Sequence, residues 1–335
     1  MSTRLLSLIT LALALLAGLV TAQQTRPEVN VYSSRSHYGE EDAFRMFERE
    51  TGIKVNLFGG STSELYERLR AEGPFTPADA FIAVDAGNLW LAAAAGLLQP
   101  VDSPVLRANI PAHLRDPENR WFGLTVRART IMYSTARVNP SELSTYAALG
   151  DPKWRGRLCL RTSNHVYNMS FVATQIAHHG LAATEQMLRA WIANRPTIIG
   201  SDTPILEAIA AGQCDVGLTN TYYLGRIQRE RPDFPVAPFW TDQDGRGTHV
   251  NISGAGVTRY AKNRSAAVRL IEYLTGPAAQ ASFAAANSEY PANPAVPPAA
   301  HIAAWGAFRA DQIQVAETGS FQAQAVRLMN QVGWR

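Results

Sequence analysis

The stretch VNVYSSRSHYGEEDAFRMFERETGIKVNLF, residues 29–58, decides the fold class. Its two ends, residues 29–33 and 53–58, are short runs rich in Val, Ile and Tyr, which is typical of buried strands. Between them, Ala43, Phe44 and Phe47 recur at helical spacing and give residues 40–50 one apolar face. A strand, a helix and a second strand in this order predict a parallel pair joined by a right-handed crossover.

The same alternation continues through the rest of the chain. Further strands are expected at residues 79–84, 121–133, 157–161, 214–218 and 251–257. Further helices are expected at residues 63–71, 87–95, 169–179, 183–193, 204–211, 263–275 and 311–332. This pattern predicts an α/β protein with two lobes joined by more than one crossing strand, an arrangement that suits a binding protein with a closing cleft. Ligands of such sheets bind at the carboxyl ends of the strands.

Composition excludes several classes of protein. The 335 residues are 46% hydrophobic and 18% charged, which is a globular composition, and the length favours about two domains. Lys and Arg number 31 against 28 Asp and Glu, so the net charge is only +3. No basic cluster with interleaved aromatic residues occurs, which argues against a nucleic-acid-binding protein.

The amino terminus has the features of a targeting segment. Arg4 precedes an apolar run over residues 5–20, and small residues follow before Gln23. This pattern predicts a cleaved signal peptide over residues 1–22 and therefore an exported protein. The apolar run is shorter than the roughly 20 residues that a membrane-spanning helix needs, although an uncleaved anchor remains the alternative.

The chain has only two cysteines, Cys159 and Cys214. An even number in an exported protein favours a disulfide bond, and two buried free thiols are the alternative. The sequence lacks CxxC, zinc-type Cys/His spacing, G-x-S-x-G, a P-loop and H-E-x-x-H, and it has no G-x-G-x-x-G between a strand and a helix. A binding protein is therefore expected rather than an enzyme.

Tyrosines follow the carboxyl ends of three expected strands. In chain order they are Tyr38 with its neighbour His37, then Tyr167, then the pair Tyr222 and Tyr223. Any one of them could simply be a half-buried aromatic side chain with its hydroxyl in water. The spacing makes a shared site more attractive, because a cysteine lies eight residues before Tyr167 and another eight residues before Tyr222. If the two cysteines are bonded, their strands are neighbours, and both tyrosine positions reach one end of the second lobe.

Several phenol oxygens in one place suit a hard, highly charged metal ion. Phenolate is a hard anionic ligand, so copper(I) is excluded and zinc is not favoured, whereas ferric iron fits well with one imidazole. Ionising a phenol at pH 7 costs about 4 kcal/mol because its pKa is about 10. The metal must supply this free energy, so binding releases protons.

Five segments resemble bacterial periplasmic ferric-iron-binding proteins, the solute receptors of ABC iron importers. They are SSRSHYGEE, VDAGNLWLAAAAGLLQPV, LRTSNHVYNMSF, GQCDVGLTNTYYLGRI and AAVRLIEYLTGPAAQ. The resemblance covers almost the whole chain after the signal peptide. It implies a two-lobed class II periplasmic binding protein fold, with hinge strands and a cleft that closes over iron. It also implies a monomer that delivers ferric iron to an inner-membrane permease.

The resemblance also implies a set of metal ligands. These are His37 and Tyr38 from the first lobe, and Tyr167, Tyr222 and Tyr223 from the second. This set is similar to that of the tyrosine-rich branch of the family, which needs no synergistic anion. Asp85 occupies the position where another branch has a glutamate ligand. Its alternative role is that of N-cap of the helix expected at residues 87–95.

The lobes expected from this resemblance are residues 23–126 with 254–302, and residues 127–253 with 303–335. Several phenolates around one ferric ion leave a negative centre, so a nearby guanidinium should stabilise them. The candidates are Arg35, Arg127, Arg129 and Arg226, with Arg226 preferred because it follows Tyr223 by three residues.

Two other functions remain open at this point. One is a receptor for a phosphorylated sugar or a phosphonate, for which Ser33, Ser34, Arg35 and Thr221 could be recruited. The other is a secreted iron- or tyrosine-dependent enzyme. Four tyrosines at strand ends argue against the anion receptor, and a shell of five protein ligands leaves an enzyme little room for substrate.

Overall fold

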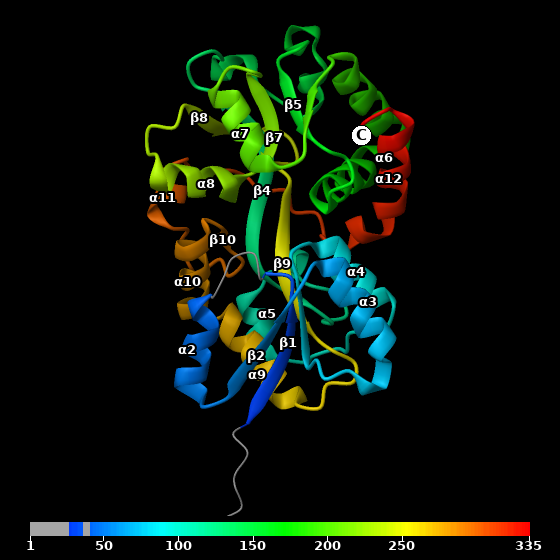
Figure 1. Ribbon diagram of the computed structural model, residues 1–335, viewed down its shortest axis with the longest axis vertical. Coiled ribbons are helices and arrows are strands. Elements are labelled where there is room, and N and C mark those ends of the chain that lie inside the picture. Colours follow the sequence, from blue (N-terminus) through cyan, green and yellow to red (C-terminus); the bar gives the residue numbers. More distant parts are fainter. Residues whose placement is uncertain (1–26, 36–40) are drawn as a thin grey trace, which may run out of the picture.

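The computed structural model describes residues 27–35 and 41–335. These residues form two α/β lobes stacked along the long axis of the molecule (Figure 1). The expected signal peptide and the pair His37 and Tyr38 lie outside the described residues. Within the described ranges, no helix is both long and apolar enough to cross a membrane.

The first lobe contains the parallel strands that the opening stretch of sequence predicted. Strand β1 (Glu28–Ser33) pairs in parallel with β2 (Lys54–Gly59) and with β3 (Ala80–Ala83). Strand β9 (Val250–Val257) joins the sheet antiparallel to β3. The helices of this lobe are α2 (Asp42–Thr51), α3 (Thr62–Glu72), α4 (Ala86–Ala94), α5 (Pro104–Asn109), α9 (Arg264–Thr275) and α10 (Pro277–Asn287).

The second lobe has a smaller sheet of its own. Strand β5 (Leu158–Arg161) pairs in parallel with β6 (Thr197–Ile199) and with β7 (Val216–Asn220). Strand β8 (Val236–Phe239) lies antiparallel to the long strand β4 (Phe122–Ser134). The other helices are α6 (Val166–Ala193), α7 (Asp202–Ala210), α8 (Thr221–Glu230), α11 (Ala300–Ala303) and α12 (Gln322–Gln331).

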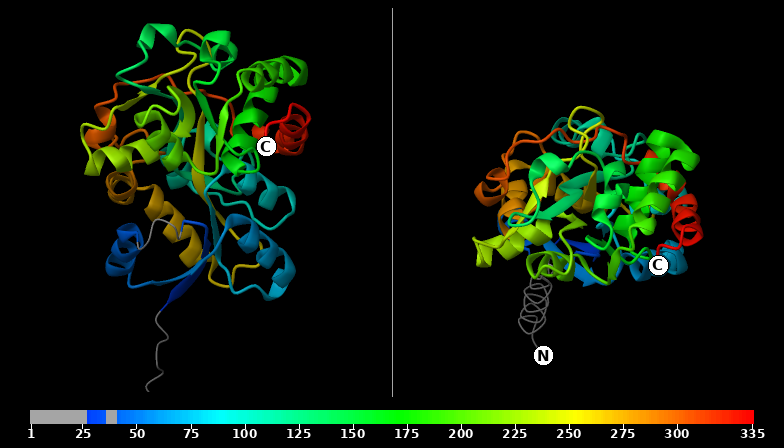
Figure 2. Two further views of the ribbon diagram at one scale, coloured as in Figure 1. Left: turned by 45° about the horizontal axis from the view of Figure 1, so that its top comes forward. Right: turned by 90° about the horizontal axis from the view of Figure 1, so that it is seen from above.

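Two long strands run between the lobes and act as hinge strands (Figure 1). Residues 122–128 of β4 pair with β9, whereas residues 129–134 of the same strand pair with β7 and β8. Both strands are buried almost throughout, β4 because it pairs with strands of both lobes and β9 because it lies between β3 and β4. The turned views show α12 at one side of the molecule, and α10 and α11 at the opposite side (Figure 2).

Each lobe is stabilised by its own hydrophobic core. Phe47, Phe81 and Trp121 are buried in the core of the first lobe, and Trp154 and Trp191 in that of the second. The chain after α11 passes between the two cores. Its Val315 and Ala316 pack into the first core, and its Leu328 and Trp334 into the second.

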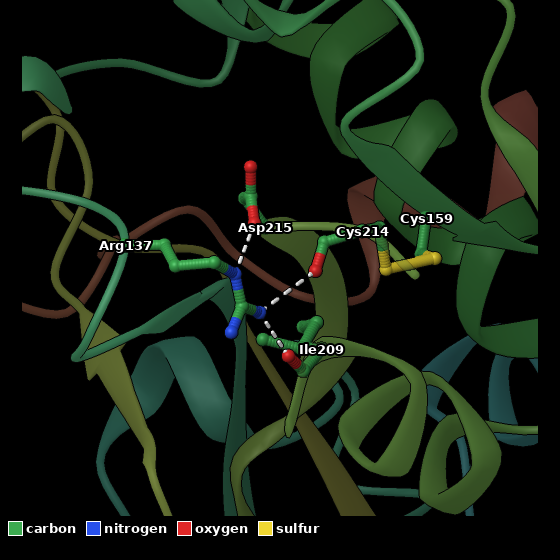
Figure 3. The surroundings of a disulfide bond; sticks show 5 residues. All are labelled: Arg137, Cys159, Ile209, Cys214 and Asp215. Carbon is green, nitrogen blue, oxygen red and sulfur yellow. Dashed lines mark hydrogen bonds and ion pairs between the residues drawn. A yellow bond between two sulfur atoms is a disulfide. The ribbon is translucent and has the colours of Figure 1, made fainter. Parts of the chain in front are cut away.

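The predicted disulfide bond is confirmed and lies in the second lobe. Cys159 and Cys214 are bonded, with their Cα atoms 5.9 Å apart, and both are buried. Arg137 lies beside the bond (Figure 3). Its guanidinium donates hydrogen bonds to the carbonyl oxygens of Ile209 and Cys214 and forms an ion pair with Asp215 at 2.6 Å. The bond therefore ties β5 to the turn that precedes β7.

The last helix begins later than predicted. The expectation of a helix from residue 311 is wrong, because α12 begins only at Gln322, after the short turn η7 (Glu317–Phe321). Asp311 instead forms a hydrogen bond with His178 of α6, with Oδ2 and Nε2 2.5 Å apart. Helix α6 also joins the two helices expected at residues 169–179 and 183–193, which meet at a kink at Gly180.

Candidate metal centre

A cavity of about 570 Å³ lies between the two lobes. First-lobe residues such as Ser63, Asn88 and Trp90 line one side, and His165, Tyr167, Tyr223 and Met169 line the other. Among the described residues, no three His, Cys, Asp or Glu side chains are arranged to hold a metal ion. Tyr167 and Tyr223 are the phenols that line this cavity.

The second-lobe tyrosines are placed by the first turns of two helices. Tyr167 is the second residue of α6, and Tyr222 and Tyr223 are the second and third residues of α8. These helices start after β5 and β7, which are parallel neighbours, so their first turns emerge at the same edge of the sheet. The partial positive charge at the amino end of each helix favours an ionised phenol there.

The structure brings these three tyrosines together. The Tyr222 hydroxyl donates a hydrogen bond to the Tyr167 hydroxyl, with the oxygens 2.9 Å apart. The ring centroids of Tyr222 and Tyr223 lie 4.3 Å apart. Tyr167 and Tyr222 are buried, whereas Tyr223 is half-buried and lines the cavity. The described part of the predicted ligand set thus forms one cluster of phenols at the wall of the cleft.

The environment of Tyr167 disfavours a phenolate while no metal is bound. Burial raises the pKa of Tyr167 above its usual value, and the nearby Tyr223 raises it further. The guanidinium of Arg127 and the hydrogen bond from Tyr222 act in the opposite direction. A cation that binds here must therefore displace a proton from a phenol that holds it firmly.

Three guanidinium groups flank the phenols. The guanidinium carbons of Arg127 and Arg161 lie 5.4 Å and 5.6 Å from the centroid of the Tyr167 ring, and that of Arg226 lies 5.0 Å from the Tyr222 ring. Nη1 of Arg127 is buried and has no hydrogen-bond partner within residues 27–35 and 41–335. Of the four arginines considered from the sequence, Arg127 and Arg226 thus lie beside the phenols. Arg161 was missed, because its position at the end of β5 has no distinctive sequence signal.

The other two candidate arginines serve different contacts. Arg129 donates hydrogen bonds to Asp202, Asn220 and Asn168, and so connects β4 with the bases of the two tyrosine-bearing helices. The guanidinium of Arg35 forms ion pairs with two buried carboxylates, which compensate its charge within the first lobe. These are Glu41, at 2.7 Å, and Glu289, at 2.9 Å.

Asp85 is the N-cap of α4, as the alternative interpretation predicted. Its Oδ1 accepts hydrogen bonds from the backbone N–H of Gly87 (2.8 Å) and from Oγ of Ser170 (2.6 Å), and its Oδ2 accepts one from Nδ2 of Asn251 (2.9 Å). Nη2 of Arg127 lies 3.8 Å from Oδ2. Burial raises the pKa of Asp85 to about 6, although Arg127 and these donors oppose the shift. Protein donors therefore engage both carboxylate oxygens.

His165 is a second residue that the sequence did not single out. It is the N-cap of α6, and its Nδ1 accepts a hydrogen bond from the backbone N–H of Tyr167 at 3.3 Å. Burial and the neighbouring Arg161 lower the pKa of His165 to about 3, so the ring is neutral at physiological pH. A neutral imidazole beside the phenols adds no positive charge that would repel a cation.

Comparison with known proteins identifies the class to which this fold and site belong. A model of the family described as bacterial extracellular solute-binding protein matches residues 42–310. The chain therefore belongs to this family.

Particular members of the family are closely similar. Iron uptake protein A1 of Synechocystis sp. is 43% identical in an alignment of 317 positions that covers 92% of this chain and 88% of that protein. The solved structure of a Trichodesmium protein (IdiA, FutA) in complex with iron and citrate ligands is 44% identical, with a TM-score of 0.88, over 92% of this chain and 100% of that one. The ferric binding protein from Campylobacter jejuni is 33% identical, with a TM-score of 0.86, over 92% of this chain and 100% of that one. These comparisons confirm the resemblance that the sequence motifs indicated.

Proposed function

We propose that this protein is a periplasmic receptor that captures ferric iron between its lobes and delivers it to the inner-membrane permease of an ABC importer. The proposed ligands are Tyr167, Tyr222 and Tyr223 from the second lobe, and His37 and Tyr38 from the first. The proposed lobes are residues 23–126 with 254–302, and residues 127–253 with 303–335. The receptor works as a monomer, and it carries iron without catalysing a reaction.

The observation that carries this proposal is the hydrogen bond between the Tyr222 and Tyr167 hydroxyls, 2.9 Å long, at the wall of the interlobe cavity. Two phenol oxygens this close can both reach one metal ion without a change in either helix. Phenolates suit ferric iron better than softer divalent ions. The iron-related names of the similar proteins support the same choice of cargo.

The two lobes have different tasks in this proposal. Three of the five ligands come from the second lobe, so iron binds there first while the cleft is open. His37 and Tyr38 reach the metal on closure, which couples occupancy to the closed shape that the permease would recognise. The loss of a second-lobe phenol should therefore weaken binding far more than the loss of His37.

The experiment is an iron titration of the purified protein. Binding is monitored through the visible absorption of tyrosinate-to-iron charge transfer. The wild type should develop this absorption with one iron per chain, Tyr223→Phe should bind much more weakly, and His37→Ala should bind nearly as well but close less completely in small-angle scattering. A wild type without the absorption, or a Tyr223→Phe variant with normal affinity, contradicts the proposal. Calorimetry with a sugar phosphate then tests the anion receptor.

We further propose that iron loading needs no synergistic anion, because five protein ligands nearly fill the coordination shell. Titrations in buffers freed of carbonate, with and without added citrate, should give the same stoichiometry and the same absorption. A requirement for citrate or carbonate would show that protein side chains alone do not complete the shell.

A further inference from the structure

The first lobe contacts α6 one turn after Tyr167. Ser170 follows Tyr167 by three residues, so the two side chains lie on the same face of the helix. Oγ of Ser170 donates to Asp85 of the first lobe at 2.6 Å and accepts a hydrogen bond from Nε2 of Gln322 at 2.8 Å. Asp85 and Ser170 are both fully buried. This is a charge-assisted hydrogen bond between the lobes, and water is excluded from it.

The first lobe contacts α8 at the equivalent position. Gly225 follows Tyr222 by three residues, and a Cβ atom placed there would lie 2.6 Å from Cβ of Ser288. It would also lie 2.7 Å from Cδ1 of Ile302, which belongs to α11 of the second lobe. Ser288 follows α10 directly. One turn further along α8, Nη1 of Arg229 donates a hydrogen bond to the carbonyl oxygen of Ala286 near the end of α10, at 2.8 Å. The backbone of α8 is thus held closely against the first lobe.

These two contacts lie on opposite sides of the hinge strands, with α4 next to α6 and α10 next to α8 (Figure 1). Each tyrosine-bearing helix is therefore fixed to the first lobe by the residue one turn beyond its buried tyrosine. A helix transmits such a constraint to its first turn because its backbone hydrogen bonds make it rigid over a few residues.

We propose that Asp85, through Ser170, and the α10 terminus, through Gly225, are positioning elements. They hold the phenols of Tyr167 and Tyr222 in the geometry of the closed, iron-loaded cleft. This inference rests on the proposed function and adds residues that are not metal ligands. It also gives Asp85 a defined task, which is to bind the tyrosine helix instead of the metal.

The first test removes the hydrogen bond to Asp85. In Ser170→Ala, iron should still produce the charge-transfer absorption, because every phenol remains. Transfer of iron to excess EDTA should be about tenfold faster, since a charge-assisted hydrogen bond is lost from the closed state. Ser170→Thr keeps the hydroxyl and should restore the wild-type rate. The control is Thr174→Val, because the Thr174 hydroxyl donates to the Ser170 carbonyl oxygen within α6, at 2.9 Å, and not to the first lobe among the described residues.

The second test acts on α8. Gly225→Ala places a methyl group where the first lobe leaves no room, so iron release should be faster and small-angle scattering should show a more open iron-loaded protein. The control is Gly200→Ala, because a Cβ atom there would lie more than 4 Å from every described residue other than its two chain neighbours. Melting curves of all variants show which of them fold. If Gly225→Ala does not fold, the release rates of Ser170→Ala, Ser170→Thr and Thr174→Val test the inference without it.

The outcomes separate this inference from the proposed function. If Ser170→Ala releases iron at the wild-type rate, or if Thr174→Val accelerates release equally, the positioning role is overturned while the receptor stands. If Ser170→Thr fails to restore the rate, the hydroxyl is not the active group, which also overturns it. If the wild type itself shows no charge-transfer absorption, the proposed function fails instead.

Discussion

The Tyr167→Phe substitution tests how iron binding depends on protons. It removes one hydroxyl and keeps the ring, so the ring contacts with His165 and Arg161 remain. Burial raises the pKa of Tyr167 above that of a free phenol, so at pH 7 its ionisation costs at least about 4 kcal/mol, which bound iron must supply. Each ligating phenol releases one proton, and the binding constant therefore rises about tenfold per pH unit for each such ligand.

The size of the pH effect follows from the number of protons that are released when iron binds. From pH 6 to pH 8, the ratio of wild-type to Tyr167→Phe iron affinity should rise about 100-fold, because only the wild type releases this proton. Both proteins are measured against one chelator in the same buffers, so iron hydrolysis and chelator protonation cancel in the ratio. The metal-free variant should also lose about 1 kcal/mol of stability with its buried hydrogen bond to Tyr222.

The control for this experiment is Tyr290→Phe. Burial raises the pKa of Tyr290 as well, and its hydroxyl has no hydrogen-bond partner in the part of the chain that the structure describes. The ratio of wild-type to Tyr290→Phe affinity should therefore stay constant with pH. A constant ratio for Tyr167→Phe would refute the assignment of Tyr167 as an ionised ligand.

Replacing both Cys159 and Cys214 by Ala opens a loop whose ends are 55 residues apart, and should lower the free energy of unfolding in urea by about 4 kcal/mol; an unchanged midpoint would contradict this. The pKa of Asp85 is raised from 3.8 to about 6, so the folded protein binds more protons than the unfolded chain between these values, and stability falls as pH rises through them. Relative to Asp85→Asn, the metal-free wild type should lose about 3 kcal/mol between pH 3.5 and pH 7, and parallel pH profiles would exclude the shift. Arg226→Gln removes the charge beside Tyr222 and should lower iron affinity about tenfold; equal affinities at every pH would show that this charge does not act on the phenols.

The arrangement of strands and helices in the first lobe could be predicted because it depends on local periodicity. The apolar positions Ala43, Phe44 and Phe47 are all buried in α2, as their spacing indicated. Helix α10 was not predicted because its alanine-rich sequence has no clear apolar face and it begins at Pro277, directly after α9 and its C-cap Gly276. The start of α12 was misplaced because Asp311 is held by His178, a partner 133 positions away that local patterns do not reveal.

The site could be predicted in part for a similar reason. The equal offsets from the two cysteines correctly predicted that Tyr167 and Tyr222 lie close together. The strand register nevertheless sets Cys159 opposite Gly217 and not opposite Cys214. The prediction succeeded because Tyr167 and Tyr222 each occupy the second position of the helix that follows their strand. The compensation of Arg35 by Glu289, 254 positions along the chain, depends on tertiary packing and has no signal in the sequence.

The most direct test of the central claim is anomalous X-ray scattering at the iron absorption edge, from crystals of the iron-loaded protein. The account predicts a single strong anomalous peak in the interlobe cavity, at bonding distance from the hydroxyl oxygens of Tyr167, Tyr222 and Tyr223. A peak elsewhere, or a peak in the cavity without these three oxygens around it, would contradict the account.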